Sequence, residues 1–349
     1  MKVLLLGGTG AMGMYLCDIL VDKGHEVFVT SRKTRSKDKV TYYLGDAHDM
    51  QFMTSILKQR YDAIIDFMIY SNEDFRNRIS CLLSATDQYF FLSSSRVYDP
   101  NTVLINEDSP LMIDTYKDAQ YQLSNSYSLY KAQQERILSE YGDNWTIIRP
   151  YITYSSSRLP LGILEKEDWL YRALRGRTVV FSEVIENKIT TLTWGNDVSM
   201  GIASLIGTKE AIGQAYHITC SQEVKWSEVL EVYINTIEKF KGYKVKVLYS
   251  KDNYLMRGGL IDQAKNDRYY DRRFDNSKIA KFLDVASFSS PHDGLEKCLL
   301  EFLKKPSFKN IAWTMEGRRD RIAHNIANFR EIPTIRNKAY YYLCRFFNK

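Results

Sequence analysis

The chain has 349 residues, of which 44% are hydrophobic and 26% charged, a composition typical of a globular protein with a substantial core. No apolar run approaches the roughly 18–20 residues that cross a bilayer, which excludes a chain built from membrane-spanning helices. The five cysteines are scattered without a CxxC pair, which argues against a disulfide framework or a zinc site and predicts a reduced, cytoplasmic protein. The net charge of +6 lies in the tail: from Lys309 onward, nine lysines and arginines oppose three acids. The global charge therefore gives no reason to expect a nucleic-acid partner.

The first 150 residues alternate short apolar runs with longer amphipathic ones, the pattern of βαβ units around a parallel sheet. The pattern predicts strands over 2–6, 26–30, 40–46, 62–69, 88–95 and 144–150, and helices over 11–23, 49–59, 74–85 and 124–141. We therefore expect an α/β fold with a Rossmann-type, doubly wound parallel sheet over residues 1–150.

The regularity weakens after Pro150. Helices are expected near 166–175, from about Asp197, and over 226–240, with strands at 215–220 and 244–249, while 250–274 gives no clear pattern. We predict a smaller substrate-binding domain over 151–305 that is interleaved with the first, since segments near 190–215 return to it. Residues 306–349 form a basic, aromatic C-terminal extension.

A glycine turn, GGTGAMG, joins the first predicted strand to the first helix. Gly7, Gly10 and Gly13 follow the spacing GxxGxxG, which suits a tight turn, a close approach of backbone to a pyrophosphate, and a helix packed near the sheet. The alternative is a strand–helix turn that needs glycine only for its backbone conformation. We favour a dinucleotide site and assign to it Gly7, Thr9, Gly10, Ala11, Met12 and Gly13.

The stretch HEVFVTSRKTR ends the second strand without the Asp or Glu that usually binds a ribose hydroxyl there. Ser31 can donate a hydrogen bond, and Arg32 can stack on adenine or pair with a 2′-phosphate. NADP is therefore favoured over NAD, although a solvated Arg32 is compatible with NAD. After the third strand, Asp46 followed by Ala47 can accept from the adenine amino group; alternatively, Asp46 caps the next helix.

Two further stretches carry the groups for proton transfer at a carbonyl or alcohol. FLSSSRVY places serines at the end of the fifth strand, and YSLYK places Tyr127 and Lys131 four residues apart on one face of a helix. An ammonium beside a phenol favours phenolate, so the tyrosine can exchange a proton near neutral pH. A serine hydroxyl across the cleft can hold the reacting oxygen of the substrate.

With these motifs in this order, the chain resembles the extended short-chain dehydrogenase/reductase superfamily of nucleotide-sugar epimerases, dehydratases and reductases. The resemblance runs from Lys2 to about Phe302 and includes Arg149-Pro150, the segment around Asp197, DNSKIAKFL and HDGLEKCL. It implies that Tyr127 is the acid/base and that Lys131 is its electrostatic partner and a ribose ligand. The family pattern SSxxVY selects Ser94 as the catalytic serine, with Ser95 as the alternative; Ser95 and Arg96 are expected near the substrate.

Departures from the family pattern reduce the number of reactions that the chain is expected to catalyse. Family dehydratases carry an Asp-Glu pair where this chain has Ser95-Arg96, so dehydration is disfavoured. The segment DFMIYS is bulkier than usual, which predicts a narrower pocket beside the nicotinamide, and Ser155-Ser156 replaces an expected glycine-proline. We expect an NADPH-dependent reductase acting on a sugar phosphate or nucleotide sugar; the alternative is an NAD-dependent nucleotide-sugar epimerase. A non-catalytic dinucleotide-binding scaffold is less favoured, because the serine, tyrosine and lysine are all present.

Arginines of the second half are candidates for binding the substrate phosphates, because a planar guanidinium suits bidentate contacts. The candidates are Arg158, Arg268, Arg272 and Arg273; the alternative is that they are solvated or pair with nearby acids such as Asp267 and Asp271. We expect His217 to be a buried, hydrogen-bonded side chain and predict no metal site.

The tail ends in AYYYLCRFFNK, which mixes aromatic and cationic residues. This composition suits contact with an anionic membrane surface, but we favour a helical extension that packs against the domain or a partner subunit. We also expect a homodimer.

Overall fold

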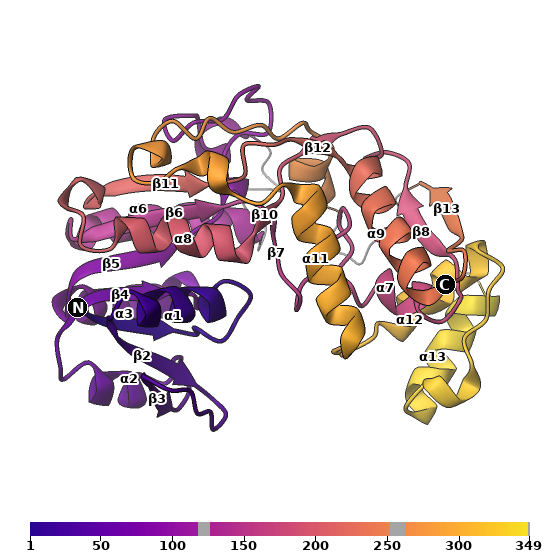
Figure 1. Cartoon of the computed structure of the whole chain (residues 1–349), viewed down its shortest axis with the longest axis horizontal. Coiled ribbons are helices and arrows are strands. Elements are labelled where there is room, and N and C mark those ends of the chain that lie inside the picture. Colours follow the sequence, from indigo (N-terminus) through magenta and orange to yellow (C-terminus); the bar gives the residue numbers. More distant parts are fainter. Residues whose placement is uncertain (118–125, 252–260, 262, 348–349) are drawn as a thin grey trace. The chain divides into compact units, whose positions relative to one another are not determined.

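The computed structural model describes residues 1–117, 126–251, 261 and 263–347. The chain forms two compact units (Figure 1). Unit 1 comprises Met1–Ser155, Thr191–Gln222 and Arg273–Ser289, and unit 2 comprises Ser156–Thr190, Glu223–Arg272 and Ser290–Lys349.

Unit 1 is built on a parallel sheet that has seven strands among the described residues, in the order β11-β6-β5-β4-β1-β2-β3. The strands are β1 (Lys2–Leu6), β2 (Glu26–Ser31), β3 (Val40–Leu44), β4 (Tyr61–Asp66), β5 (Thr86–Leu92), β6 (Trp145–Pro150) and β11 (Gln214–Ile218). The chain winds outward from β1 to β3, then crosses back to β4 on the other side of β1. The doubly wound Rossmann-type sheet is confirmed, with its switch point between β1 and β4.

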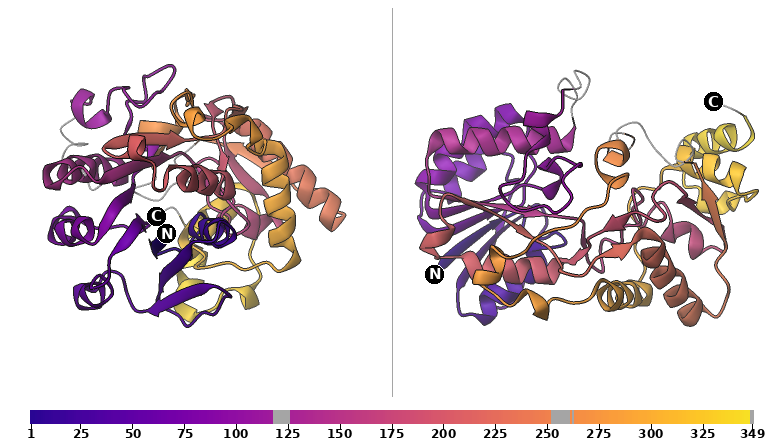
Figure 2. Two further views of the ribbon diagram at one scale, coloured as in Figure 1. Left: turned by 60° about the vertical axis from the view of Figure 1, so that its left-hand side comes forward. Right: turned by 90° about the horizontal axis from the view of Figure 1, so that it is seen from above.

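Helices cover both faces of this sheet (Figure 2). Val3 and Leu5 of β1 pack with α1 (Gly13–Asp22) and α8 (Gly195–Leu205). The alternate residues of the same strand pack on the opposite face with α2 (Met50–Ile56), α3 (Asn72–Ser84) and α6 (Tyr127–Tyr141). Because both faces of β1 are buried, the strand reads in the sequence as a continuous apolar run.

Unit 1 also contains short elements from later in the chain. They are η1 (Ser95–Val97), α4 (Met112–Thr115), β7 (Thr153–Tyr154), β10 (Thr193–Trp194), η2 (Lys209–Ala211), η5 (Ile279–Lys281) and η6 (Val285–Ser287). Arg273–Ser289, which we placed in the substrate domain, returns to unit 1. The reason is backbone pairing: the Ile105 N–H donates to the Arg273 carbonyl at 2.9 Å, and the Asp275 N–H donates to the Ile105 carbonyl at 2.8 Å.

Unit 2 is smaller and mixes helices with short strand pairs. Its elements are α7 (Leu170–Ala173), β8 (Val179–Ser182), β9 (Ile189–Thr190), β12 (Val224–Lys225), α9 (Trp226–Lys241), β13 (Val247–Ser250), η4 (Ala264–Arg268), α11 (Pro291–Lys304), α12 (Trp313–Ile322), η7 (Phe329–Glu331) and α13 (Ile335–Phe346). β13 pairs with β8 in parallel, and β12 pairs with β9 in antiparallel fashion. The α9 and α11 helices pack against each other.

The C-terminal residues are part of unit 2, because buried ion pairs join α12 to α7. Arg172 is fully buried and contacts Glu316 at 3.0 Å and Asp320 at 2.7 Å. The helices α12 and α13 lie side by side (yellow in Figure 1), and a Cβ at Gly317 would lie only 2.4 Å from the Tyr341 carbonyl oxygen. Across the residues that the structure describes, none of the helices combines the length and apolarity required to span a membrane.

Candidate functional site

The glycine turn after β1 has the geometry of a phosphate cradle. Gly7 has a φ of 68°, in the left-handed region that favours glycine, and its N–H donates to the Thr30 hydroxyl at 3.0 Å. A Cβ at Gly13 would lie 2.6 Å from the backbone of Gly8, so only glycine lets α1 start this close to the turn. A Cβ at Gly10 would have no heavy atom within 4 Å, so the backbone there faces open space.

The start of α1 suits an anion beside that open space. The first turn holds no acidic residue, and no side chain of the described residues caps it. The turn is anchored from behind, where the Ser199 hydroxyl donates to the Met12 carbonyl at 2.9 Å. Backbone N–H groups and the positive end of the helix dipole therefore fit a dinucleotide pyrophosphate. Thr9, Ala11 and Met12, which are half-buried, remain predicted cofactor contacts.

The end of β2 gives no support to a preference for NADP. The Ser31 hydroxyl donates to the Lys33 carbonyl at 2.7 Å and accepts from the Lys33 N–H at 3.2 Å, so it is already engaged in a local turn. Arg32 is exposed. An exposed Arg32 matches the alternative given in the sequence analysis, in which the arginine is solvated and the cofactor is NAD.

Asp46 does not cap α2, contrary to one of the two interpretations. Its carboxylate accepts from the His48 N–H at 3.0 Å, whereas Asp49 caps the helix by accepting from the Gln51 N–H at 2.8 Å. The adenine contact of Asp46 stays a prediction. Ala47 is buried, and its carbonyl accepts from Arg78 at 2.9 Å.

The two candidate serines after β5 have different environments. The Ser94 hydroxyl accepts from the Arg96 N–H at 3.2 Å at the start of η1. Ser95 is fully buried, and its hydroxyl donates to the Arg149 carbonyl at 2.6 Å. Ser95 thus ties η1 to β6, and its contact with the substrate stays a prediction. Ser94 remains the candidate for the reacting oxygen.

Tyr127 and Lys131 lie on the first turns of α6, near η1. The Lys131 Nζ lies 5.9 Å from the centroid of the Tyr127 ring, and the Arg96 guanidinium carbon lies 5.6 Å from it. The Ser126 hydroxyl caps the helix by accepting from the Leu129 N–H at 3.3 Å, which fixes where Tyr127 enters the helix. Both cations therefore lie near the ring of the tyrosine that is the candidate acid/base.

Lys131 is 2% exposed, and its Nζ lies 4.5 Å from the centroid of the Phe91 ring. Burial lowers the pKa of its ammonium to about 8, and the carboxylates of Asp66 and Glu135 oppose that shift. A lysine with this pKa is mostly charged at neutral pH and still close to its titration range.

Asp66, at the end of β4, is a buried acid that sequence reasoning missed. Its carboxylate accepts from the Tyr89 hydroxyl at 2.8 Å and the Met68 N–H at 2.9 Å, while burial raises its pKa. Asp66 is also the strand partner of Phe91, over which Lys131 lies. The available signal was an acid that closes the apolar run AII within DAIID.

A second missed group is the buried pair of Arg149 and Glu135. The guanidinium donates to both carboxylate oxygens of Glu135, at 3.0 and 2.7 Å, and to the Tyr98 hydroxyl at 3.0 Å. Glu135 follows Lys131 by one helical turn, so the pair holds α6 against β6 and the turn after η1. The sequence showed Arg149 only as part of a family motif without a role.

His217 is a structural residue, as predicted. It is fully buried, and its Nε2 lies 2.7 Å from the Asp275 carbonyl oxygen, so the neutral ring donates from Nε2. Burial lowers its pKa to about 4. Asp197 accepts from the Ser289 N–H at 2.9 Å. Within the described ranges, no three His, Cys, Asp or Glu side chains form a group that could hold a metal.

The candidate arginines of unit 2 are paired with acids, the alternative that the sequence left open. Arg158 donates to Glu165 through Nε at 3.1 Å and Nη2 at 2.8 Å. Arg268 and Arg272 are both buried beside Asp267; Arg272 lies 3.3 Å from it, and Arg268 also donates to a backbone carbonyl. A role in phosphate binding stays a prediction, weakened for the two buried arginines.

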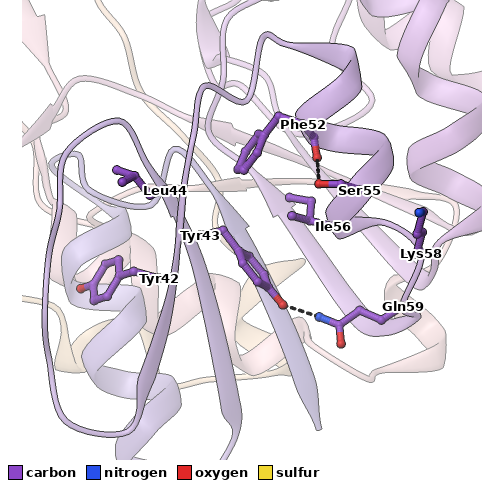
Figure 3. Close-up of a pocket in the computed structure, with 8 residues that line it drawn as sticks. All are labelled: Tyr42, Tyr43, Leu44, Phe52, Ser55, Ile56, Lys58 and Gln59. Atoms are coloured by element: carbon purple, nitrogen blue, oxygen red, sulfur yellow. Dashed lines mark hydrogen bonds between the residues drawn. The ribbon is translucent and has the colours of Figure 1, made fainter.

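A cavity of about 510 Å³ lies along the outer strand of the sheet, between β3 and α2 (Figure 3). It is lined by Tyr42, Tyr43, Leu44, Phe52, Ser55, Ile56, Lys58 and Gln59, and the figure shows Tyr43 and Gln59 directed at each other. None of the predicted site residues lines it. We therefore separate this cavity from the candidate active site.

Comparisons with known proteins bear on the family and the fold of the chain. Residues 3–166 match the model of the NAD dependent epimerase/dehydratase family. The chloroplast stem-loop binding protein of 41 kDa b from Arabidopsis thaliana is 24% identical over 237 residues, covering 62% of this chain and 58% of that protein. UDP-glucose 4-epimerase from Streptococcus mutans is 33% identical over 79 residues, covering 20% of this chain and 24% of that protein. The chain thus spans less than two thirds of the length of these relatives.

Among solved structures, UDP-glucuronic acid 4-epimerase from Bacillus cereus in complex with NAD superposes with a TM-score of 0.64 at 17% identity. The match covers 87% of this chain and 100% of that chain, so the two chains have similar folds. The motifs, the sheet and the family match together place residues 3–166 of the chain in the NAD-dependent epimerase/dehydratase family.

Proposed function

We propose that the chain is an NAD-dependent nucleotide-sugar epimerase that inverts one carbon through reversible oxidation. The observation that carries this proposal is the position of Tyr127, with Lys131 and Arg96 near its ring and Ser94 two residues from that arginine. These residues follow β5 or begin α6, on the same unit as the glycine turn. In open α/β sheets, ligands bind at the carboxyl ends of the strands, where β1 and β5 deliver these groups.

The residues of the chain supply the proton transfer. Tyr127 would take the proton of a sugar hydroxyl as its carbon becomes a ketone, and return it after the carbon is reduced on the opposite face. Lys131 stabilises the phenolate, and Ser94 holds the reacting oxygen. Bound NAD supplies reversible hydride acceptance at that carbon. Oxidation and re-reduction cancel, so the reaction has no net redox change.

An epimerase is preferred over the NADPH reductase that the sequence favoured. The reductase rested on a 2′-phosphate site at Ser31 and Arg32, but the serine hydroxyl is engaged with Lys33 and the arginine is exposed. Relatives by sequence include UDP-glucose 4-epimerases, and a similar fold is that of an epimerase in complex with NAD. These findings support a recycled NAD rather than a consumed NADPH.

The test has two parts. The nucleotide released from the purified, denatured protein is identified as NAD or NADP, and the protein is incubated with UDP-glucose, UDP-galactose and UDP-glucuronic acid while products are followed by NMR. We expect co-purified NAD and interconversion of one 4-epimer pair without net oxidation of NADH or NADPH. Net NADPH oxidation that depends on a sugar would restore the reductase.

A binding function is the remaining alternative, since the name of the Arabidopsis relative indicates a stem-loop ligand. The presence of Ser94, Tyr127 and Lys131 together supports turnover instead. Binding of a stem-loop RNA without turnover of any nucleotide sugar in the same preparation would contradict the epimerase.

A further inference from the structure

The outward side of α13 is an exposed apolar surface. The apolar side chains on this side have exposed fractions of 86% for Ile335, 42% for Tyr340, 46% for Leu343 and 57% for Phe346. The exposed Arg336 lies among them, and Phe347, 62% exposed, follows the helix directly. At 3.6 residues per turn, the helical members fall within about 140° of arc. We call this set of six residues the α13 outer face. A helix face this apolar marks an interaction surface rather than an ordinary solvated one.

The opposite side of α13 is fixed to unit 2. Tyr341 is fully buried and its hydroxyl donates to Asp320 at 2.6 Å, while the Arg345 guanidinium donates to the Asn325 carbonyl at 2.6 Å. Gly317 lets α12 approach the backbone of α13 closely. The outer face is therefore held in place before it meets a partner, which reduces the entropy lost on binding.

The apolar surface continues into the segment before α13. Phe329 is 57% exposed and stacks on Tyr342 with ring centroids 6.4 Å apart. Ile326 is 58% exposed, and the Nζ of Lys338 lies 3.7 Å from the centroid of the Phe329 ring. Cations thus border the apolar surface rather than lying apart from it.

The charge of α13 selects the partner. Its sequence IRNKAYYYLCRF carries three cations, Arg336, Lys338 and Arg345, and no acid. Arg336 lies on the outer face and Lys338 borders it over the Phe329 ring, whereas Arg345 lies on the side that is bound to Asn325. In a symmetric dimer the outer face would meet itself, so Arg336 would meet no acid of α13. An anionic bilayer surface complements both the apolar residues and the cations, whose long side chains can reach the headgroups while aromatic rings enter the interface.

We propose that the α13 outer face docks unit 2 on a membrane surface rich in anionic phospholipid. The 12-residue helix lies in the interface rather than crossing it, with Leu343 and Phe346 entering the boundary of the acyl chains. Arg336 and Lys338 contact the phosphate headgroups. The binding itself does not depend on the proposed epimerase activity.

Co-sedimentation of the full chain with vesicles tests this proposal. One set is phosphatidylcholine alone, and the other contains about one third phosphatidylglycerol. We expect pelleting with the anionic vesicles only, and less of it as salt screens the headgroups. The variant Leu343→Ser/Phe346→Ser should lower the vesicle partition coefficient at least about tenfold, because it removes apolar surface. The variant Arg336→Gln/Lys338→Gln should lower the same coefficient roughly fivefold for each cation removed.

The matched control is Val103→Ser/Leu104→Ser, which removes two aliphatic side chains that are 77% and 54% exposed elsewhere; its pelleting should equal that of the unmodified chain. Substitutions replace deletion of the tail, because α12 and α13 also carry buried contacts. Unchanged thermal midpoints show that each variant is folded.

Three results would overturn the proposal: no pelleting with anionic vesicles, pelleting that the outer-face variant retains, or a dimer in sedimentation velocity that Leu343→Ser/Phe346→Ser dissociates. The last result would assign the face to a second copy of the chain.

Discussion

The ammonium of Lys131 lies 4.5 Å from the centroid of the Phe91 ring, and Phe91 is paired across the sheet with the buried Asp66. This relationship puts a lysine with a pKa of about 8 beside the proposed acid/base. Because the charged form exists below that pKa, activity that needs the cation should be present near neutral pH and fall as pH rises through about 8. The pH profile of kcat/KM measures this alkaline limb.

Asp66→Asn provides a sharper form of the same experiment. Asp66 is the carboxylate that most opposes the lowering of the Lys131 pKa. Removing its charge should lower that pKa further, so the alkaline limb should move to lower pH while the cofactor remains bound. A limb that stays in place would show that another group controls it.

Tyr127→Phe should reduce turnover by about 10²–10⁴-fold, because the phenol oxygen is the group that takes and returns the proton. The ring, and with it the packing beside Lys131 and Arg96, is retained. Cofactor affinity should therefore change little, as measured by titration of NAD. Near-normal turnover would mean that a different residue is the acid/base.

Ser94→Ala and Ser95→Ala should separate catalysis from stability. Ser94→Ala should lower kcat by about 10²-fold, since it removes a hydrogen bond to the reacting oxygen. Ser95→Ala should leave a buried backbone carbonyl without its 2.6 Å hydrogen bond and lower the free energy of unfolding by about 1–2 kcal/mol. Urea unfolding and steady-state kinetics on both variants decide the assignment; the reverse pattern would make Ser95 the catalytic serine.

The burial of His217 should make the protein less stable in mild acid. Its pKa is about 4 in the folded chain, against 6.5 without burial, so the unfolded state binds the proton first as pH falls. This difference removes about 2 kcal/mol between pH 7 and 5. His217→Gln should flatten that part of the profile in urea unfolding, whereas the same change at the exposed His292 should not.

The buried ion pairs of unit 2 should be sensitive to removal of one partner. Arg172→Met removes one of the cations that Glu316 and Asp320 contact, while Arg177 still pairs with them at 3.0 and 2.8 Å. The loss of these charged hydrogen bonds should lower the free energy of unfolding by about 1.5–3 kcal/mol. Arg60→Met is the matched control, because its pair with Asp87 is exposed, and it should cost less than about 1 kcal/mol. Equal effects would indicate that the tail is not part of the core of unit 2.

Much of the fold follows from local sequence. Continuous apolar strands such as Lys2–Leu6 indicate a sheet buried on both faces, and the spacing of Gly7, Gly10 and Gly13 indicates the phosphate turn. These signals are readable because strand burial and glycine geometry depend on a few neighbouring residues. The Tyr127–Lys131 spacing is equally local, since one helical turn separates the two residues.

Only the tertiary structure decided what each polar group contacts. Ser94 and Ser95 are adjacent in the sequence, yet their hydroxyls have different partners. The Ser94 hydroxyl accepts from the nearby Arg96 N–H, whereas the Ser95 hydroxyl donates to the Arg149 carbonyl on β6. The sequence determined the sheet, the glycine turn and the Tyr-Lys pair, because each depends on near neighbours. Asp66 beside Lys131, the buried tail and the exposed side of α13 depend on residues far apart in the chain, which only packing brings together.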